Sequence, residues 1–222
     1  MSAAFLRSLV LGYLLPGSIL LHQMAIRQSE ELPPDFTVAG AVGLAGDEAR
    51  RTAAELGMDA SDPIILQIKL DFGPARCTLR IAGPHPIAVV DDRGQVSGTP
   101  LAWAAAFTRL VCLPFLFRGE QGGDPLENLL RKAGGNFEES ALTLEDGVVC
   151  YLLGAGESGA GPAGLVIKKR ELVPVRVWAQ ENAARYEVHF GDYREAFRQG
   201  GFPTRIELRA NGAPIARFSA TP

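Results

Sequence analysis

The sequence predicts an α+β fold in which one antiparallel β-sheet carries helices on one of its faces. Most of the chain alternates apolar and polar residues with a period of two, in segments joined by short turns. Four segments have helical patterns instead, and one of these is apolar almost all round. Consecutive strands with short turns indicate an antiparallel meander rather than alternating βαβ units.

Length and composition set the class of protein. The 222 residues are enough for one domain, and 47% hydrophobic against 21% charged residues is a globular composition. A net charge of −3 gives no basic face for phosphates, so no nucleic-acid partner is expected. Only 3 histidines are present, and we expect no metal and no cofactor. We expect residues 16–222 to form a single domain and the protein to be a monomer.

The N-terminal segment leaves two interpretations open. Residues 5–15, FLRSLVLGYLL, are apolar with one early arginine and are followed by Pro16-Gly17. This stretch is too short for a confident transmembrane span. It is either the remnant of an export signal or an apolar first helix of the folded domain, and we favour export.

The first third of the chain begins with a helix and then changes period. Residues 18–31 predict an amphipathic helix with Ile19, Leu20, Met24 and Ala25 on one face and Gln28 turned away. Phe36, Val38, Val42 and Leu44 alternate with small residues and predict a strand. Residues 47–57 predict a second helix that ends at Gly57, the usual C-cap residue. Strand patterns follow at residues 64–70, 76–82 and 86–91.

The middle of the chain predicts two further helices. Thr99 and Pro100 suit the start of the first, which is apolar to Leu113 and which Pro114 is expected to end. Asp124-Pro125 begins a short helix that Gly134 closes. From about residue 140 onward strands are predicted at 141–145, 148–153, 164–169, 172–179, 185–191, 204–210 and 214–219. Asp146-Gly147 and Asn211-Gly212 are typical of tight hairpin turns.

A glycine-rich loop raises the question of dinucleotide binding. Gly154-Ala-Gly156-Glu-Ser-Gly159 matches G-x-G-x-x-G and follows a strand. The fingerprint also needs a helix whose N-terminus meets the pyrophosphate. The next residues, Gly161-Pro162-Ala-Gly164, cannot propagate a helix, and an apolar strand pattern follows them. We therefore interpret the loop as a hairpin connection.

Residues that carry other chemistry are sparse. There is no G-x-S-x-G elbow, and His22, His85 and His189 are each expected to be structural or exposed, so no catalytic residues are predicted. Cys77, Cys112 and Cys150 lie far apart without a C-x-x-C motif. Three small buried thiols are the favoured interpretation, and one disulfide with one free thiol is the alternative.

The C-terminal third resembles a known superfamily. Tyr186 to Arg194 ends in Asp-Tyr-Arg, and Phe202-Pro203-Thr-Arg-Ile206 and Asn211-Gly212 follow. This order is similar to the closing strands of the LolA/LolB-like superfamily, the periplasmic lipoprotein carriers and outer-membrane lipoprotein receptors. Val38-Ala-Gly40 in the first strand and the helical insertion fit the same order. The likeness spans roughly residues 17–219.

The resemblance implies an incomplete, half-open antiparallel β-barrel of about eleven strands, with helices covering its concave face over an apolar cavity. It implies a non-enzymatic periplasmic carrier that binds the acyl chains of lipoproteins or other lipids and passes them to an outer-membrane acceptor or inner-membrane exporter. The alternative is an interaction module on the same fold with a filled core. No lipobox cysteine is present, which disfavours an anchored LolB-type receptor. The residues expected to line the cavity are Phe36, Val38, Leu66, Ile68, Leu79, Ile81, Phe107, Leu110, Phe115, Phe117 and Val177. Trp178 adjoins Val177 on the same strand, so at most one of the two can point inward.

Overall fold

The computed structural model describes most of the chain from residue 15 onward. The described residues are 15–59, 63–74, 76–81, 86–91, 93–98, 101–154, 161–181, 183–193 and 201–221. Of the apolar segment 5–15 only Leu15 is included, so both interpretations of that segment remain expectations. His85, Thr99, Pro100 and the glycine-rich loop between Gly154 and Gly161 also lie outside the described residues.

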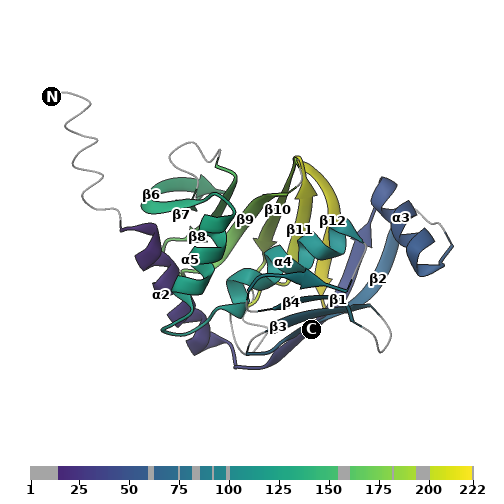
Figure 1. Cartoon of the computed structure of the whole chain (residues 1–222), viewed down its shortest axis with the longest axis horizontal. Coiled ribbons are helices and arrows are strands. Elements are labelled where there is room, and N and C mark those ends of the chain that lie inside the picture. Colours follow the sequence, from purple (N-terminus) through teal and green to yellow (C-terminus); the bar gives the residue numbers. More distant parts are fainter. Residues whose placement is uncertain are drawn as a thin grey trace.

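One antiparallel sheet of twelve strands forms the frame of the molecule (Figure 1). The strands are β1 Phe36–Leu44, β2 Ile64–Phe72, β3 Arg76–Ile81, β4 Pro86–Asp91, β5 Val96–Ser97, β6 Asn136–Glu145, β7 Val148–Gly154, β8 Ala163–Lys168, β9 Pro174–Glu181, β10 Ala184–Gly191, β11 Arg205–Ala210 and β12 Ala213–Ala220. Their order is β5-β4-β3-β2-β1-β12-β11-β10-β9-β8-β7-β6, so the first strand pairs with the last.

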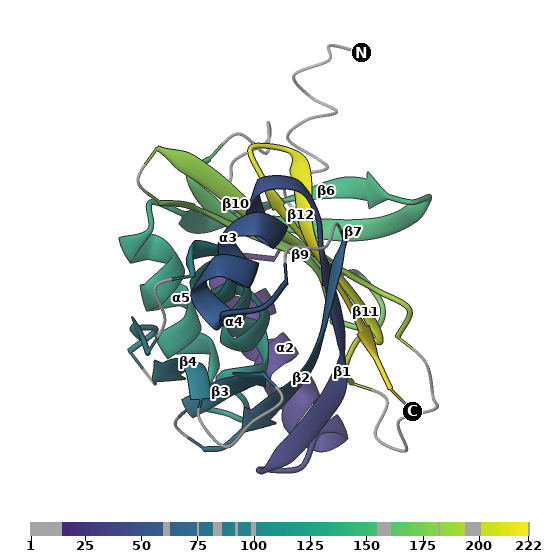
Figure 2. The same cartoon turned by 90° about the vertical axis from the view of Figure 1, so that its right-hand side faces the viewer.

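The sheet stays open because consecutive strands of the sequence lie at its two edges. β5 and β6 are the edge strands, and the chain between them forms the helices α4 (Ala102–Leu116) and α5 (Gly123–Lys132). α4 packs on strands of both halves of the sheet, and α2 (Gly17–Glu31) packs beside α5 and β6. Figure 2 shows these three helices on one side of the curved sheet. The predicted α+β fold, an incomplete antiparallel barrel with helices on its concave face, is confirmed.

Most predicted elements are present with shifted ends. α3 (Gly46–Leu56) ends at Gly57, whose φ of 63° is the left-handed conformation that glycine adopts without strain. Asp146 and Gly147 in one hairpin, and Asn211 and Gly212 in the other, all have positive φ, as the predicted tight turns require. β6 begins at Asn136, five residues earlier than the alternation predicts, because a register shift between Asn136 and Ser140 breaks the pattern. β8 begins at Ala163, so a strand and not a helix follows the glycine-rich loop.

The prediction that Pro114 ends the central helix was wrong. α4 continues to Leu116, and Leu113 to Leu116 are all buried. Proline removes the hydrogen bond to the carbonyl four residues earlier and crowds that carbonyl. Burial of this last turn against the sheet therefore outweighs the local cost that the sequence indicates.

The predicted faces of α2 also need correction. Ile19 is 43% exposed, although it was expected on the apolar face, and Gln28 is 1% exposed, although it was expected to face away. The buried face follows Leu20, Leu21, Met24 and Gln28 because α2 is held between α5 and the edge strand β6. Tertiary neighbours, which the periodicity of a single helix does not contain, select this face.

Two of the three cysteines form a disulfide. Cys77 on β3 and Cys112 on α4 are joined with an Sγ–Sγ distance of 2.01 Å, and Cys150 is a buried free thiol. The favoured interpretation of three free thiols was therefore wrong, and the alternative holds. The pairing follows from α4 crossing the face to which β3 contributes, which brings together two residues 35 apart in the sequence.

Candidate functional site

The structure brings all eleven predicted cavity residues into one apolar interior between the sheet and the helices. Nine of them are buried, and Phe36 and Ile81 are partly buried against the same cluster. Val177 points into this interior, whereas Trp178 packs on the opposite face of the sheet with Cys150, Leu152 and Val166. The alternation along β9 thus separates the two neighbours as predicted. In this structure the residues contact one another as a packed core.

A cluster of phenylalanine rings fills one end of this interior. Phe36 and Phe72 stack with ring centroids 4.3 Å apart. Phe202 lies 4.8 Å from Phe115 and 5.5 Å from Phe72, and Phe190 lies 5.6 Å from Phe115. Sequence reasoning placed Phe202 in the Phe-Pro motif but did not assign it to the interior. The signal available in the sequence was the Phe-Pro motif, which lies just before β11.

The central helix α4 is attached at three points along its length. The Trp103 indole Nε1 donates to the Thr52 hydroxyl of α3 over 2.9 Å. The Cys112 disulfide attaches the helix to β3, and Arg109 forms an ion pair with Glu181 at the end of β9. Among the described residues, no hydrogen bond or ion pair joins α5 to α4. α4 is therefore the fixed wall of the space between the two helices.

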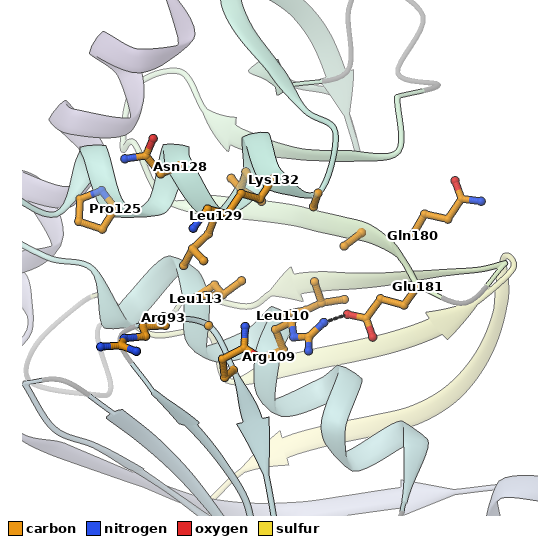
Figure 3. Close-up of a pocket in the computed structure, with 15 residues that line it drawn as sticks. Arg93, Arg109, Leu110, Leu113, Pro125, Asn128, Leu129, Lys132, Gln180 and Glu181 are labelled. Carbon is orange, nitrogen blue, oxygen red and sulfur yellow. Dashed lines mark hydrogen bonds and ion pairs between the residues drawn. The ribbon is translucent and has the colours of Figure 1, made fainter.

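A cleft of about 750 Å³ opens between α4 and α5 (Figure 3). Its other sides are the turn between β4 and β5 and the end of β9. Its apolar lining includes Leu110 and Leu113 of α4, Leu129 of α5 and Ala179 of β9. Leu110 alone of the eleven predicted residues lines this cleft, because the other ten lie deeper or further along the sheet.

Cationic side chains gather around this cleft. Arg93, Arg109 and Lys132 line it, and Glu181, the acidic residue among its lining residues, already pairs with Arg109. The Nε atom of Arg109 is buried and has no hydrogen-bond partner. The cleft thus combines apolar walls with a positive mouth.

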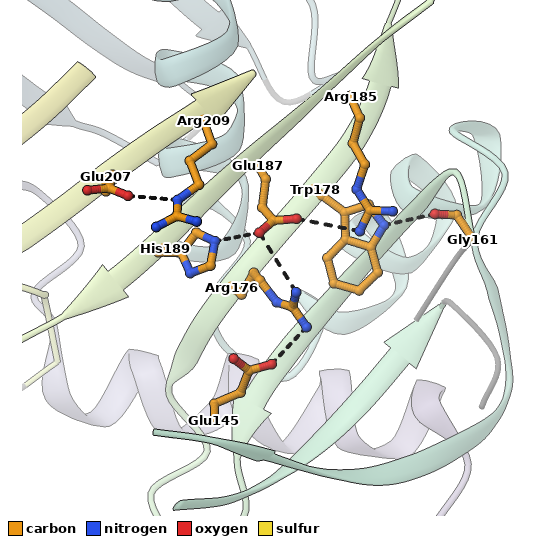
Figure 4. A network of polar contacts seen from close by, with 9 residues as sticks. All are labelled: Glu145, Gly161, Arg176, Trp178, Arg185, Glu187, His189, Glu207 and Arg209. Carbon is orange, nitrogen blue, oxygen red and sulfur yellow. Dashed lines mark hydrogen bonds and ion pairs between the residues drawn. The ribbon is translucent and has the colours of Figure 1, made fainter. Parts of the chain in front are cut away.

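A polar network covers the opposite face of the sheet (Figure 4). Arg176 bonds Glu145 over 2.7 Å and lies 3.7 Å from Glu187, which also contacts His189. If burial acted alone, it would raise the pKa of Glu187 above its usual value. The hydrogen bond from His189 and the nearby positive charges outweigh burial, so the pKa of this carboxyl lies below its usual value. The indole of Trp178 lies between the guanidinium groups of Arg176 and Arg185, 5.2 and 4.9 Å from its ring.

This network has the geometry of a structural ladder. His189 lies between the buried Val188 and Phe190 and faces outward, as predicted. His22 is partly exposed on α2, far from this network in the sequence and on the helical side of the sheet. Within the described residues no three histidine, cysteine or acidic side chains are grouped so that they could hold a metal ion. Glu187 has two arginine neighbours, Arg176 and Arg185, and also contacts the His189 ring, which satisfies this carboxylate without a ligand.

The fold and the site define a class of protein: an open antiparallel half-barrel with helices and an apolar cleft on its concave side. No family model and no curated protein matches the sequence. Among solved structures, the chain is similar to a LolA superfamily protein from Nitrosomonas europaea, with 12% identity over 94% of this chain and 92% of the other and a TM-score of 0.47. It is also similar to an outer membrane lipoprotein-sorting protein domain from Vibrio parahaemolyticus, with 9% identity over 90% of each chain and a TM-score of 0.47. No helix among the described residues is long and apolar enough to cross a membrane.

Proposed function

We propose that the protein is a non-enzymatic periplasmic carrier that binds the acyl chain of a lipid or an acylated protein in the cleft between α4 and α5. The observation that carries this proposal is the cleft itself, with leucines on both helical walls and the exposed cations Arg93 and Lys132 among its lining residues. Its volume of about 750 Å³ lies within the range of roughly 300–1,000 Å³ that small-molecule sites occupy. The resemblance of the C-terminal motif to lipoprotein carriers points to the same class.

The energetics of this cleft suit an amphiphile with an acidic head group. Each buried methylene group contributes about 0.8 kcal/mol, so about ten of them contribute on the order of 8 kcal/mol before the cost of association. Arg93 and Lys132 are exposed near the open end, where a carboxylate or phosphate would remain hydrated. Arg109, which adjoins Leu110 on α4, also lines the cleft and is paired with Glu181. We infer that the chain lies along the leucines and the acidic head meets these cations.

The wider interior is expected to receive the rest of a long chain if α5 moves outward. Leu110 lines the cleft and also belongs to the packed core, so it links the two spaces. α4 is attached at three points, whereas α5 packs mainly on α2 through apolar contacts. Transfer to an outer-membrane acceptor or an inner-membrane exporter would then need displacement of α5 without any chemical step.

Titration with a fluorescent fatty acid and with the monoacylglycerol of the same chain length tests this proposal. Leu129→Glu places a carboxylate on the half-buried wall of the cleft and is expected to weaken the binding of both by about tenfold or more. The double substitution Arg93→Glu and Lys132→Glu is expected to weaken only the fatty acid. Met58→Glu, at an exposed apolar position outside the cleft, is the matched control and is expected to bind as the wild type does.

Native mass spectrometry and lipid extraction of protein purified from membrane-containing cells identify the natural ligand. A bound acyl species near one equivalent would support the proposal and give the ligand class. A ligand-free mass, together with no uptake of either probe, would contradict it. The second candidate, an interaction module with a filled core, would then hold, and the observation that favours it is the close packing of ten of the eleven predicted residues.

A further inference from the structure

Exposed aliphatic side chains gather at one edge of the sheet. Eight large apolar side chains are exposed among the described residues. Four of them, Leu142, Leu144, Val148 and Val149, belong to the β6–β7 hairpin, and two, Leu15 and Ile19, lie at the start of α2, which packs on β6. The remaining two, Met58 and Ile65, lie elsewhere, beside α3 and on β2. Isolated exposed apolar residues are ordinary, but a contiguous group on an edge strand is not.

Most of the group shares one face of the hairpin. Leu144 pairs with Val149 and Leu142 pairs with Tyr151, so these four side chains point to the same side. We call them the hairpin face. Leu153, two residues after Tyr151, continues this side into the core, so the hairpin face is the part of the concave side that the helices leave uncovered. Figure 2 shows the β6–β7 hairpin projecting to the right, away from α4 and α5.

The N-terminal segment enters the fold beside this face. The Ser140 hydroxyl, which lies on the same side of β6 as Leu142 and Leu144, donates to the Leu15 carbonyl over 2.6 Å. The sequence that precedes this point, FLRSLVLGYLL, is itself apolar. Of this segment the structure describes Leu15, which is 38% exposed and lies beside the hairpin face.

Basic residues flank the hairpin face. The Lys169 backbone N–H donates to the Val149 carbonyl over 3.1 Å, and its ammonium lies 5.8 Å from the Tyr151 ring. Lys169 and Arg170 are both exposed, as are Asp146 and Glu171 at the same end of the sheet, whereas the ammonium of Lys168 lies over the Tyr193 ring on the opposite face. Aliphatic side chains next to a tyrosine and lysine or arginine residues are the composition of the membrane–water interface, where cations meet lipid phosphates.

We propose that the hairpin face is a docking surface for an anionic lipid bilayer. Leu144, which is 68% exposed, and Val149 reach the boundary of the acyl chains, while Lys169 and Arg170 lie at the level of the phosphates. The exposed cations Lys169 and Arg170 beside these aliphatic side chains favour an anionic bilayer over a folded protein partner. This inference does not depend on whether the cleft binds lipid.

Flotation of the full chain with vesicles tests this surface. The vesicles are an equimolar mixture of phosphatidylcholine and phosphatidylglycerol, with pure phosphatidylcholine for comparison. The wild type is expected to float with the mixed vesicles and more weakly with the neutral ones. Leu144→Glu with Val149→Glu is expected to lower the bound fraction about tenfold or more. Met58→Glu with Ile65→Glu adds the same charge at exposed apolar positions elsewhere and is the matched control.

Each outcome decides the proposal. Loss of flotation in the hairpin variant alone, with unchanged thermal unfolding, supports it. Equal flotation of both double variants would overturn it, because membrane binding would then not involve the hairpin face. A wild type that stays with the soluble fraction would also overturn it. A wild type that sediments as a dimer, against a monomeric hairpin variant, would assign the face to a second copy of the chain instead.

Discussion

The disulfide between Cys77 and Cys112 is expected to supply a large part of the stability of this domain. It closes a loop of 35 residues and attaches α4, the fixed wall of the cleft, to β3. The chain-entropy relation gives about 13 cal/mol/K for a loop of this length, which is about 3.8 kcal/mol at room temperature. Whole domains are stable by only about 5–15 kcal/mol, so this loss is a substantial fraction of the total.

Urea unfolding of the oxidised protein and of the Cys77→Ala, Cys112→Ala variant measures this contribution. The free energy of unfolding is expected to fall by about 4 kcal/mol, and the melting temperature by about 10 °C. Cys150→Ala, which removes the buried free thiol without opening the bridge, is the control for lost packing alone. A double variant no less stable than this control would refute the reasoning, as would three reactive thiols in the denatured, unreduced wild type.

Two further predictions concern the sheet. Gly164→Ala is expected to destabilise the fold by about 1–3 kcal/mol in urea unfolding, because the added Cβ would overlap the buried Trp178 indole. Gly43→Ala is the control and is expected to be nearly neutral, because the atom nearest to its added Cβ, the Arg217 carbonyl oxygen, is 3.9 Å away. Equal effects of the two substitutions would contradict this packing. The pKa of Glu187 lies below its usual value in the fold, so its contribution to stability is present above about pH 4.3 and is lost as the pH falls toward the folded pKa. Glu187→Gln is therefore expected to reduce the acid sensitivity of unfolding, and an unchanged pH profile would show that this carboxyl is not stabilised in the fold.

The strands and turns of this protein were predictable because their signals are local. A period of two along β2, the positive-φ pair Asp146-Gly147 and the C-cap Gly57 each depend on residues within a few positions of one another. The rejection of a dinucleotide site was equally local, since glycine and proline after Gly159 cannot form a helix. The apolar character of these positions was local too: nine of the eleven predicted residues belong to one buried cluster, and Phe36 and Ile81 pack against it. That they line a ligand cavity stays a prediction.

The course of α4 across the sheet, in contrast, was decided only in three dimensions. α4 continues past Pro114 because its last turn is buried against the sheet. Its position also brings Cys112 to Cys77 and Arg109 to Glu181, and both of these contacts join residues that are distant in the sequence. The burial of Gln28 and the exposure of Ile19 follow in the same way from the neighbours of α2. Sequence alone indicated most of the residues that avoid water, since that depends largely on their chemistry and spacing. Tertiary structure determined which of them face one another and where a cleft remains between them, since that depends on packing between distant segments.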